Sequence, residues 1–222
     1  QLASRFPRRV RQRWGEGLTQ TRSAYLLPDI ALSIASAYYG RQDVPLAVDL
    51  PGDPSTVRCY FIADGRDDPY GAKRYATGQA GHRKALHLPY FWAGAQRGPD
   101  ALGLVVYREE DLNEPERTGL KSHFVFRRNH DGLFVGDRQV TFGDEGRRQA
   151  TVLPGETVVV RYAAAAVVIR VLFARRRDGW AASTAVVDDG NSHGALRLSV
   201  DHDAIHDQGE QAAACFWVRI GS

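Results

Sequence analysis

The sequence of 222 residues contains no methionine, only two cysteines, and no long apolar run. Because a natural chain starts with methionine unless something has been removed, we expect a piece of a longer or processed protein. The apolar run 163–172, bounded by Arg161 and interrupted by Arg170, is too short for the roughly 18 to 20 apolar residues of a membrane span. Neither a membrane-spanning segment nor a signal peptide is therefore expected in this sequence.

An excess of charge of one sign is also missing. Lysine and arginine number 29 against 26 aspartate and glutamate, a formal net charge of +3. That excess does not argue for nucleic acid, and we expect no nucleic-acid or membrane partner. Cys59 and Cys215 each lie in an alternating apolar run, which predicts two largely buried thiols. A disulfide between them would suit an exported protein, and the sequence leaves that pairing open.

Helical periodicity and fixed-period repeats are absent as well, which argues against parallel α/β folds, propellers and solenoids. Apolar and polar residues alternate instead, as Leu32 and Ile34 do with Ser33. Roughly a dozen short runs of this kind, separated by turn residues, are typical of a β-sandwich. We predict an all-β fold, a large antiparallel, supersandwich-like β-sandwich with one long functional loop. The expected strands are 21–27, 30–40, 45–50, 56–64, 88–95, 101–107, 122–128, 132–135, 137–142, 156–162, 166–174, 180–187, 195–200 and 214–220.

Residues 21–222 are expected to form a single sandwich domain, because a chain of this length and composition can bury one good core. Residues 1–20 are predicted to be a basic N-terminal arm or linker. This arm also carries Phe6, Val10 and Trp14, so we expect it to lie across a neighbouring domain or the sandwich edge. RNA or membrane binding is the alternative for an arginine-rich segment.

The stretch 64–92 holds the greatest density of polar chemistry. Loops of such length are functional or disordered, and the many aromatic residues here argue against disorder. His82 and His87 have side chains suited to proton transfer near neutral pH, and neighbouring cations would lower the pKa of Tyr70. We therefore predict His82, His87 and Tyr70 as catalytic residues. The residues predicted to bind substrate are Arg74, Tyr75, Arg83, Lys84 and Trp92.

Cations and proton-transfer groups together suit a lyase reaction on a uronic acid. Arg74, Arg83 and Lys84 would stabilise charge that develops on the carboxylate while a base removes the C5 proton. In the alternative interpretation His87 caps a strand and His82 bonds a loop carbonyl. The cluster Asp201, His202, Asp203, His206 and Asp207 resembles a set of metal ligands, but neighbours on a strand point to opposite faces. We interpret this cluster as a solvated strand end and predict neither a metal nor a cofactor.

Several segments together resemble the β-sandwich part of heparinase II/III-like polysaccharide lyases. They are YLLPDIALSIASAYYG (25–40), DPYG (68–71), GHRKALHLPYFWAGAQRG (81–98), VGDRQV (135–140) and LPGETVVVRY (153–162). The resemblance implies a preceding helical toroid, absent from this chain, and a polysaccharide or oligosaccharide in the cleft between toroid and sandwich. It further implies lyase activity on acidic polysaccharide, with part of the active site missing here, in a secreted or periplasmic protein.

A second hypothesis from another class is a non-catalytic carbohydrate-binding or interdomain support module. Its signature would be exposed aromatic rings that stack on sugars, which Tyr70, Tyr75, Tyr90 and Trp92 could provide. Convergence of His82, His87 and Tyr70 on a shared cleft would favour catalysis instead. An adhesive or viral sandwich without a ligand is the third reading.

Overall fold

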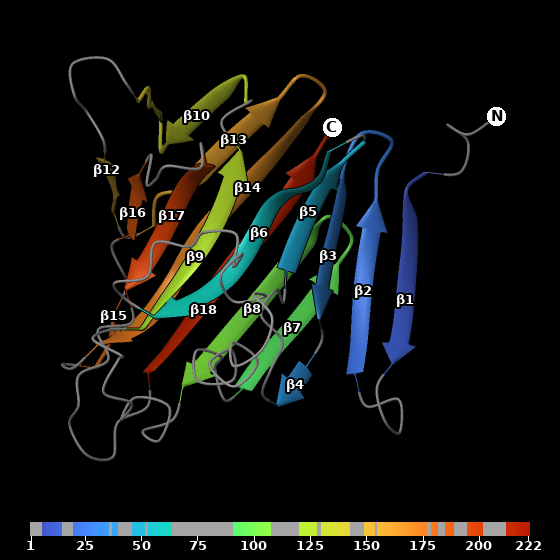
Figure 1. Ribbon diagram of the computed structural model, residues 1–222, viewed down its shortest axis with the longest axis horizontal. Helices are drawn as coiled ribbons and strands as arrows, with labels where there is room; N and C mark the ends of the chain where they lie inside the picture. The colour runs from blue at the N-terminus through green and yellow to red at the C-terminus, as the bar shows by residue number, and fades with distance from the viewer. Residues whose placement is uncertain are drawn as a thin grey trace, which may run out of the picture.

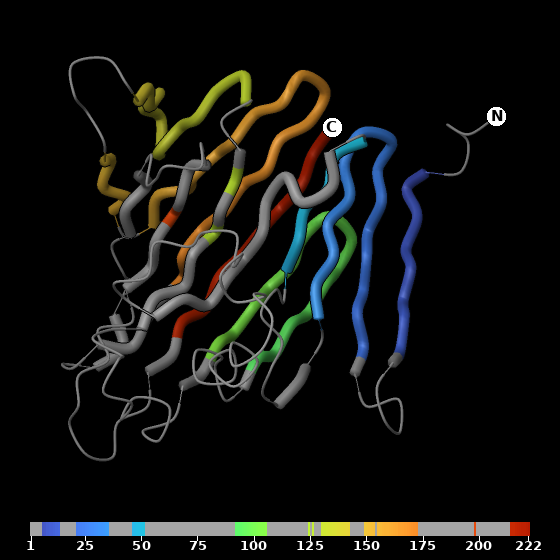
Figure 2. The backbone as a smooth tube through the Cα atoms, in the orientation of Figure 1, coloured from blue at the N-terminus to red at the C-terminus, as the bar shows by residue number. Residues whose placement is uncertain are grey.

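The computed structural model describes fourteen segments of the chain, and every structural statement below concerns them (Figures 1 and 2). They are residues 6–14, 20–35, 37–39, 46–51, 53–63, 91–107, 120–127, 130–142, 149–153, 155–176, 179–181, 185–188, 195–201 and 212–222. Strands dominate these segments and no helix occurs in them, so none of the described residues belongs to a helix able to cross a membrane.

The strands form two nine-stranded sheets in which the pairings between described strands are antiparallel. The first sheet has the order β1 (Arg8–Trp14), β2 (Gln20–Leu26), β3 (Ala31–Ala35), β5 (Leu46–Leu50), β6 (Asp53–Ala63), β9 (Leu120–Arg127), β17 (Ala195–Asp201), β16 (Ala185–Asp188) and β12 (Gln149–Val152). The second has the order β11 (Arg138–Gln139), β10 (Gly132–Val135), β13 (Val158–Tyr162), β14 (Ala165–Arg176), β18 (Ala212–Gly221), β8 (Asp100–Tyr107), β7 (Phe91–Arg97) and β4 (Ala37–Tyr39), with β15 (Gly179–Ala181) paired to β14. The predicted antiparallel β-sandwich is confirmed.

The core lies between the two sheets. Alternate residues of β18, such as Phe216 and Val218, are fully buried, while Arg219 between Val218 and Ile220 is exposed. The rings of Phe124 in the first sheet and Phe216 in the second meet edge to face, with centroids 5.1 Å apart and planes at 79°. Such edge-to-face pairs add about 1 kcal/mol to the burial of the rings themselves. The alternation read from the sequence therefore corresponds to one buried face on each sheet.

Two runs expected as single strands are instead divided between the sheets. Residues 30–40 give β3 in the first sheet and β4 in the second. Residues 180–187 likewise give β15, which pairs with β14, and β16, which pairs with β17. Alternation is a property of each extended strand and does not depend on which sheet the strand joins, so the pattern alone does not reveal such a crossing.

The N-terminal arm contains a strand. β1 pairs with β2 along its whole length, from Arg8 opposite Leu26 to Trp14 opposite Gln20, and it is the outermost strand of the first sheet. The sandwich edge was one of the two locations expected for this arm. Here it extends the sheet rather than lying across it.

The described cysteine is not in a disulfide. Cys215 on β18 is a free, half-buried thiol, and burial raises its pKa, more strongly than the Phe216 backbone hydrogen bond lowers it. Cys59 is on β6 in the other sheet, and its side chain lies outside the described residues. The thiol of Cys215 is therefore expected to be a weak nucleophile at neutral pH.

Candidate functional site

Most residues predicted to form the site lie outside the described residues. These are Tyr70, Arg74, Tyr75, His82, Arg83, Lys84 and His87, all within 64–90. Whether they converge on one surface therefore stays a prediction.

Trp92 is described, and its expected role as a ligand-facing aromatic requires correction. Its side chain is fully buried, and its indole N–H donates a 2.9 Å hydrogen bond to the carbonyl oxygen of Ala35. The ring occupies space that a Cβ at Gly103 would fill. Trp92 is thus a core residue, because the inward face of β7 packs against β3.

The two ends of the segment 64–90 are described and belong to different sheets. The segment leaves β6 at Ala63, in the first sheet, and re-enters the fold at Phe91 of β7, in the second. Ala63 pairs with Leu120 at the start of β9, and Phe91 pairs with Val106 near the end of β8. Both ends are thereby fixed by strands at the same end of the sandwich, the lower end in Figure 1.

Two further connections between the sheets start and finish at this end. One joins Tyr107 of β8 to Leu120 of β9, and the other joins Asp201 of β17 to Ala212 of β18. Asp201 pairs with Lys121, next to Leu120, and Ala212 pairs with Tyr107. The three connections therefore begin and end on neighbouring strands in both sheets. In sequence they are rich in titratable residues, with Glu109, Glu110 and Asp111 in one and His202 and His206 in the other.

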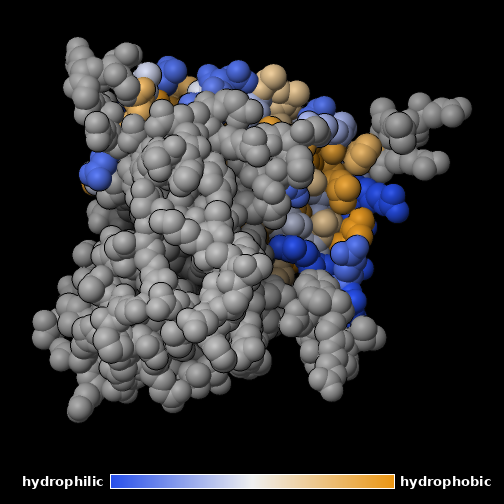
Figure 3. Space-filling view, viewed as in Figure 1, coloured by the Kyte–Doolittle hydropathy of each residue, from blue (hydrophilic) through white to orange (hydrophobic). Residues whose placement is uncertain are grey.

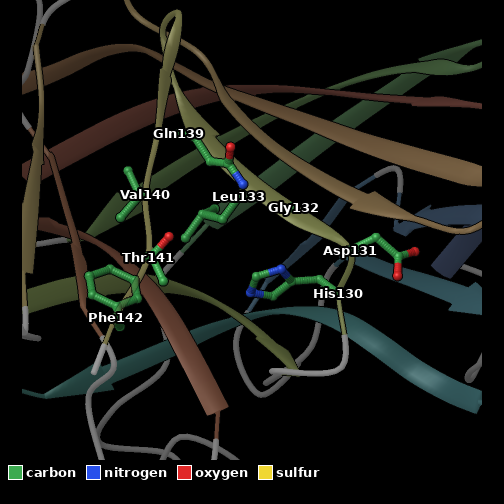
Figure 4. Close-up of a pocket in the computed structure, with 8 residues that line it drawn as sticks. All are labelled: His130, Asp131, Gly132, Leu133, Gln139, Val140, Thr141 and Phe142. Atoms are coloured by element: carbon green, nitrogen blue, oxygen red, sulfur yellow. The ribbon is translucent and has the colours of Figure 1, made fainter. Parts of the chain in front are cut away.

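At the opposite end of β9 the described residues form a pocket of about 270 Å³ (Figure 4). The lining residues are His130, Asp131, Gly132, Leu133, Gln139, Val140, Thr141 and Phe142. The β10–β11 hairpin shapes this pocket, because Gly136 adopts φ +57° in its two-residue turn and the Val140 N–H donates to Leu133 O at 2.8 Å. Asp131 is held at the entrance to β10 by its N–H, which donates to Arg161 O at 2.8 Å.

The imidazole of His130 lines this pocket together with the polar side chains of Gln139 and Thr141. Figure 4 shows the ring directed into the space beside Thr141 and Phe142, while the carboxylate of Asp131 points away. Desolvation by burial lowers the pKa of His130, and the charge of Asp131 opposes that shift more weakly. The buried Nδ1 has no hydrogen-bond partner in the part of the chain that the structure describes. A neutral ring with an unsatisfied nitrogen can bond water or a hydroxyl group.

The described residues that line this pocket do not include the cations expected of a lyase centre. Among them there is no lysine or arginine to stabilise charge on a uronate carboxylate. His130 follows β9 in the stretch RRNHDG, and only the turn character of Asn129 to Gly132 marked it in the sequence. A single histidine in a turn gives no spacing pattern from which a pocket could be predicted.

Within the described ranges no three His, Cys, Asp or Glu side chains are placed to hold one metal ion. Of the residues interpreted as a solvated strand end, Asp201 is the last residue of β17, and 202–207 lie outside the described residues. Comparison with known proteins adds no relative: no protein-family model, no curated protein and no solved structure matches this chain.

Proposed function

We propose that this chain is the glycan-facing β-sandwich domain of a secreted or periplasmic polysaccharide-degrading enzyme. The substrate is an acidic, uronate-containing polysaccharide, and the reaction is lyase cleavage. His82, His87 and Tyr70 transfer protons, and Arg74, Arg83 and Lys84 neutralise the uronate carboxylate. A neighbouring helical domain of the same polypeptide supplies the rest of the active site.

One observation carries this proposal. The segment 64–90 starts and finishes at the end of the sandwich where two other connections rich in titratable residues also start and finish. Groups of loops at one end of a rigid sandwich are a common location for binding and catalytic residues. Strands beneath such loops hold polar groups in fixed positions, which proton transfer to and from a sugar ring requires.

The test is turnover of acidic polysaccharides by the full-length parent polypeptide, followed by the ultraviolet absorbance of unsaturated uronate products. His82→Ala and His87→Ala should each lower turnover by about 10²-fold or more, the usual effect of losing a general acid or base. Arg74→Ala and Lys84→Ala should lower it as well. Arg170→Ala serves as the matched cation control, because Arg170 is exposed on β14 away from this end.

Thermal unfolding of each variant separates chemistry from folding. Loss of turnover at an unchanged melting temperature supports catalysis by this segment. If both histidine variants keep full turnover and full glycan binding while they lose thermal stability, the histidines are structural and the lyase proposal is overturned.

A second candidate, a support module for a neighbouring domain, is favoured by the outer face of the second sheet. Leu102 is 44% exposed there, and it pairs with Trp217 on one side and Ala95 on the other. Apolar groups that neighbour one another on a sheet surface are typical of contacts with another domain. In that case, Leu102→Asp would weaken attachment of the helical domain, measured by limited proteolysis of the parent polypeptide, and the histidine variants would keep their turnover.

A further inference from the structure

The ribbon formed by β1 and β2 extends beyond the second sheet. Figure 1, viewed through both layers, shows β1 and β2 lying past β7 and β4, the last strands of the second sheet on that side. Figure 3 shows the same side of the molecule with each residue coloured by its hydropathy. The inner face of the first sheet is covered by the second sheet at β3, where Leu32 and Ile34 are fully buried. At β1 the same face is open, because Arg9, Arg11 and Arg13 are all exposed.

The strand register places these arginines on that inner face. Tyr25 pairs with Leu32 and Ser23 pairs with Ile34, while Arg9 pairs with Tyr25 and Arg11 with Ser23. Residues directly opposite each other in an antiparallel pair point to the same face of the sheet. Arg9, opposite Tyr25, which is opposite Leu32, therefore lies on the same face as the buried Leu32. We name this surface the arginine ledge; its residues are Arg9, Arg11, Arg13, Thr21, Ser23 and Tyr25.

The ledge has regular spacing and a mixed composition. Successive arginines are two residues apart on one strand, which separates their Cα atoms by about 6.8 Å. Each has a polar neighbour on β2: Tyr25 opposite Arg9, Ser23 opposite Arg11 and Thr21 opposite Arg13. The guanidinium of Arg9 reaches toward the β7–β8 turn, with Nη2 4.0 Å from the position a Cβ would take at Gly98. The ledge is therefore bounded on one side by the edge of the second sheet.

The positive charge of the ledge is not compensated in the described structure. Among the described residues, ion pairs join Arg138 to Glu156 and Arg219 to Asp100, and neither pair includes a ledge residue. No described carboxylate pairs with Arg9, Arg11 or Arg13. Like charges in a row on one strand repel one another, so an anionic ligand placed over them would relieve that repulsion.

We propose that the arginine ledge binds an anionic polysaccharide, whose carboxylate or sulfate groups contact Arg9, Arg11 and Arg13. This inference rests on the proposed function and adds a binding surface outside the segment 64–90. The hydroxyl groups of Ser23 and Thr21 bond sugar hydroxyls, and the half-buried ring of Tyr25 offers its exposed part to a sugar face. Arginine, hydroxyl and aromatic groups together match a ligand that is both charged and polyhydroxylated.

Two other polyanions fit the ledge less well. An acidic peptide strand added to the free edge of β1 would bond the β1 backbone and would not use the polar side chains of β2. Single-stranded nucleic acid would be expected to stack several bases on several aromatic rings, and among the ledge residues Tyr25 is the sole aromatic one. Both remain outcomes that the test can detect.

The test measures affinity of the chain for polygalacturonate and dextran sulfate, with neutral dextran, polyglutamate and an oligothymidine as comparison ligands. The triple variant Arg9→Ala, Arg11→Ala, Arg13→Ala should weaken binding of the acidic polysaccharides by about tenfold or more at low salt, because three exposed ion pairs are lost. Its affinity should also depend less steeply on salt concentration. The control variant Arg8→Ala, Arg161→Ala, Arg170→Ala removes the same charge from other faces and should change affinity by less than about threefold. Tyr25→Leu should weaken binding without changing the salt dependence.

The outcomes separate this inference from the proposed function. If the unmodified chain binds acidic polysaccharide and the ledge variant binds it equally well, the ledge is not the site, although the proposed function stands. If the unmodified chain binds no acidic polysaccharide, the ledge proposal is overturned, and turnover by the parent polypeptide still decides the proposed function. If the chain binds polyglutamate or oligothymidine more tightly than the acidic polysaccharides and the ledge variant loses that binding, the ledge binds that polymer instead. If both triple variants lose the same affinity for acidic polysaccharide, binding depends on overall charge and not on the ledge.

Discussion

The indole N–H of Trp92 donates a 2.9 Å hydrogen bond to the carbonyl oxygen of Ala35, 57 positions earlier in the chain. Ala35 is the last residue of β3, after which the chain passes to β4 in the other sheet. Both residues are fully or almost fully buried. The bond therefore links the second sheet to the first beside a crossing between them.

Replacing Trp92 with phenylalanine should destabilise the fold strongly. The change removes the donor to a buried carbonyl and leaves part of the indole volume empty, so we expect a loss of about 2 to 4 kcal/mol in the free energy of unfolding. Trp217→Phe is the control, because its indole N–H donates to Asp100 Oδ1 at 3.1 Å in a half-buried setting. Trp217→Phe should lower the free energy of unfolding by about 1 kcal/mol. Urea unfolding measures both, and equal losses would contradict the role of the Trp92 bond.

Two glycines opposite each other on β7 and β8 should resist substitution. A Cβ at Gly94 would collide with the backbone oxygen of Ala35, and one at Gly103 would collide with the Trp92 ring. We expect Gly94→Ala and Gly103→Ala each to lower the free energy of unfolding by about 1 to 3 kcal/mol or more. A Cβ at Gly221 meets nothing within 4 Å, so Gly221→Ala should change stability by about 0.5 kcal/mol or less. Thermal unfolding compares the three variants, and a stable Gly94→Ala protein would refute the close approach.

The sequence predicted the fold class because alternation and turn residues are local signals. The hairpin of VGDRQV is a clear case, since Val135 pairs with Arg138 around a turn whose Gly136 has φ +57°. What alternation does not contain is the identity of the partner strand. The run 30–40 therefore gave no sign that its two halves belong to different sheets.

The site was harder to predict for the same reason. Trp92 belongs to a polar, aromatic-rich stretch, yet the strand that contains it places its ring in the core. Arg9, Arg11 and Arg13 were recognised only as part of a basic arm, because their shared face becomes visible once β1 pairs with β2. His130 gave no spacing signal at all. For Trp92 the deciding contact is with Ala35, 57 positions earlier in the chain.

A charge-assisted hydrogen bond stabilises the turn after β12. Glu156 Oε2 accepts the Leu153 N–H at 2.7 Å, the Glu156 N–H donates to Leu153 O at 3.0 Å, and Gly155 has φ +87°. Arg138 also lies 3.2 Å from Glu156 Oε2, but it is 58% exposed, so that ion pair contributes little.

Glu156→Ala should therefore cost more than loss of its ion-pair partner. We expect a decrease of about 1 to 2 kcal/mol in the free energy of unfolding for Glu156→Ala and about 0.5 kcal/mol for Arg138→Ala. Glu156→Gln keeps an acceptor for the Leu153 N–H, so its decrease in the free energy of unfolding should lie between those of Glu156→Ala and Arg138→Ala. Chemical unfolding of the three variants measures the order, and a larger effect for Arg138→Ala would show that the ion pair dominates.

The lowered pKa of His130 predicts how stability changes with pH. Above the ordinary pKa of 6.5 both the folded and the unfolded chain hold this imidazole neutral, so the contribution of His130 to stability is fully present. As the pH falls below that value, the unfolded chain binds a proton that the folded chain resists. The free energy of unfolding therefore decreases with acidification until the pH passes the lower folded-state pKa.

His130→Gln should remove this dependence. Between about pH 7.5 and about pH 5.5 the melting temperature of the unmodified protein should fall further than that of the variant, because the other histidines titrate in both. Asp131→Asn should act in the opposite direction, since the Asp131 charge raises the His130 pKa and its removal would lower that pKa further. Acid sensitivity should thus increase from His130→Gln through the unmodified protein to Asp131→Asn. Calorimetry at several pH values measures the order, and identical pH profiles for the His130→Gln and unmodified proteins would show that the ring is solvated in the folded state.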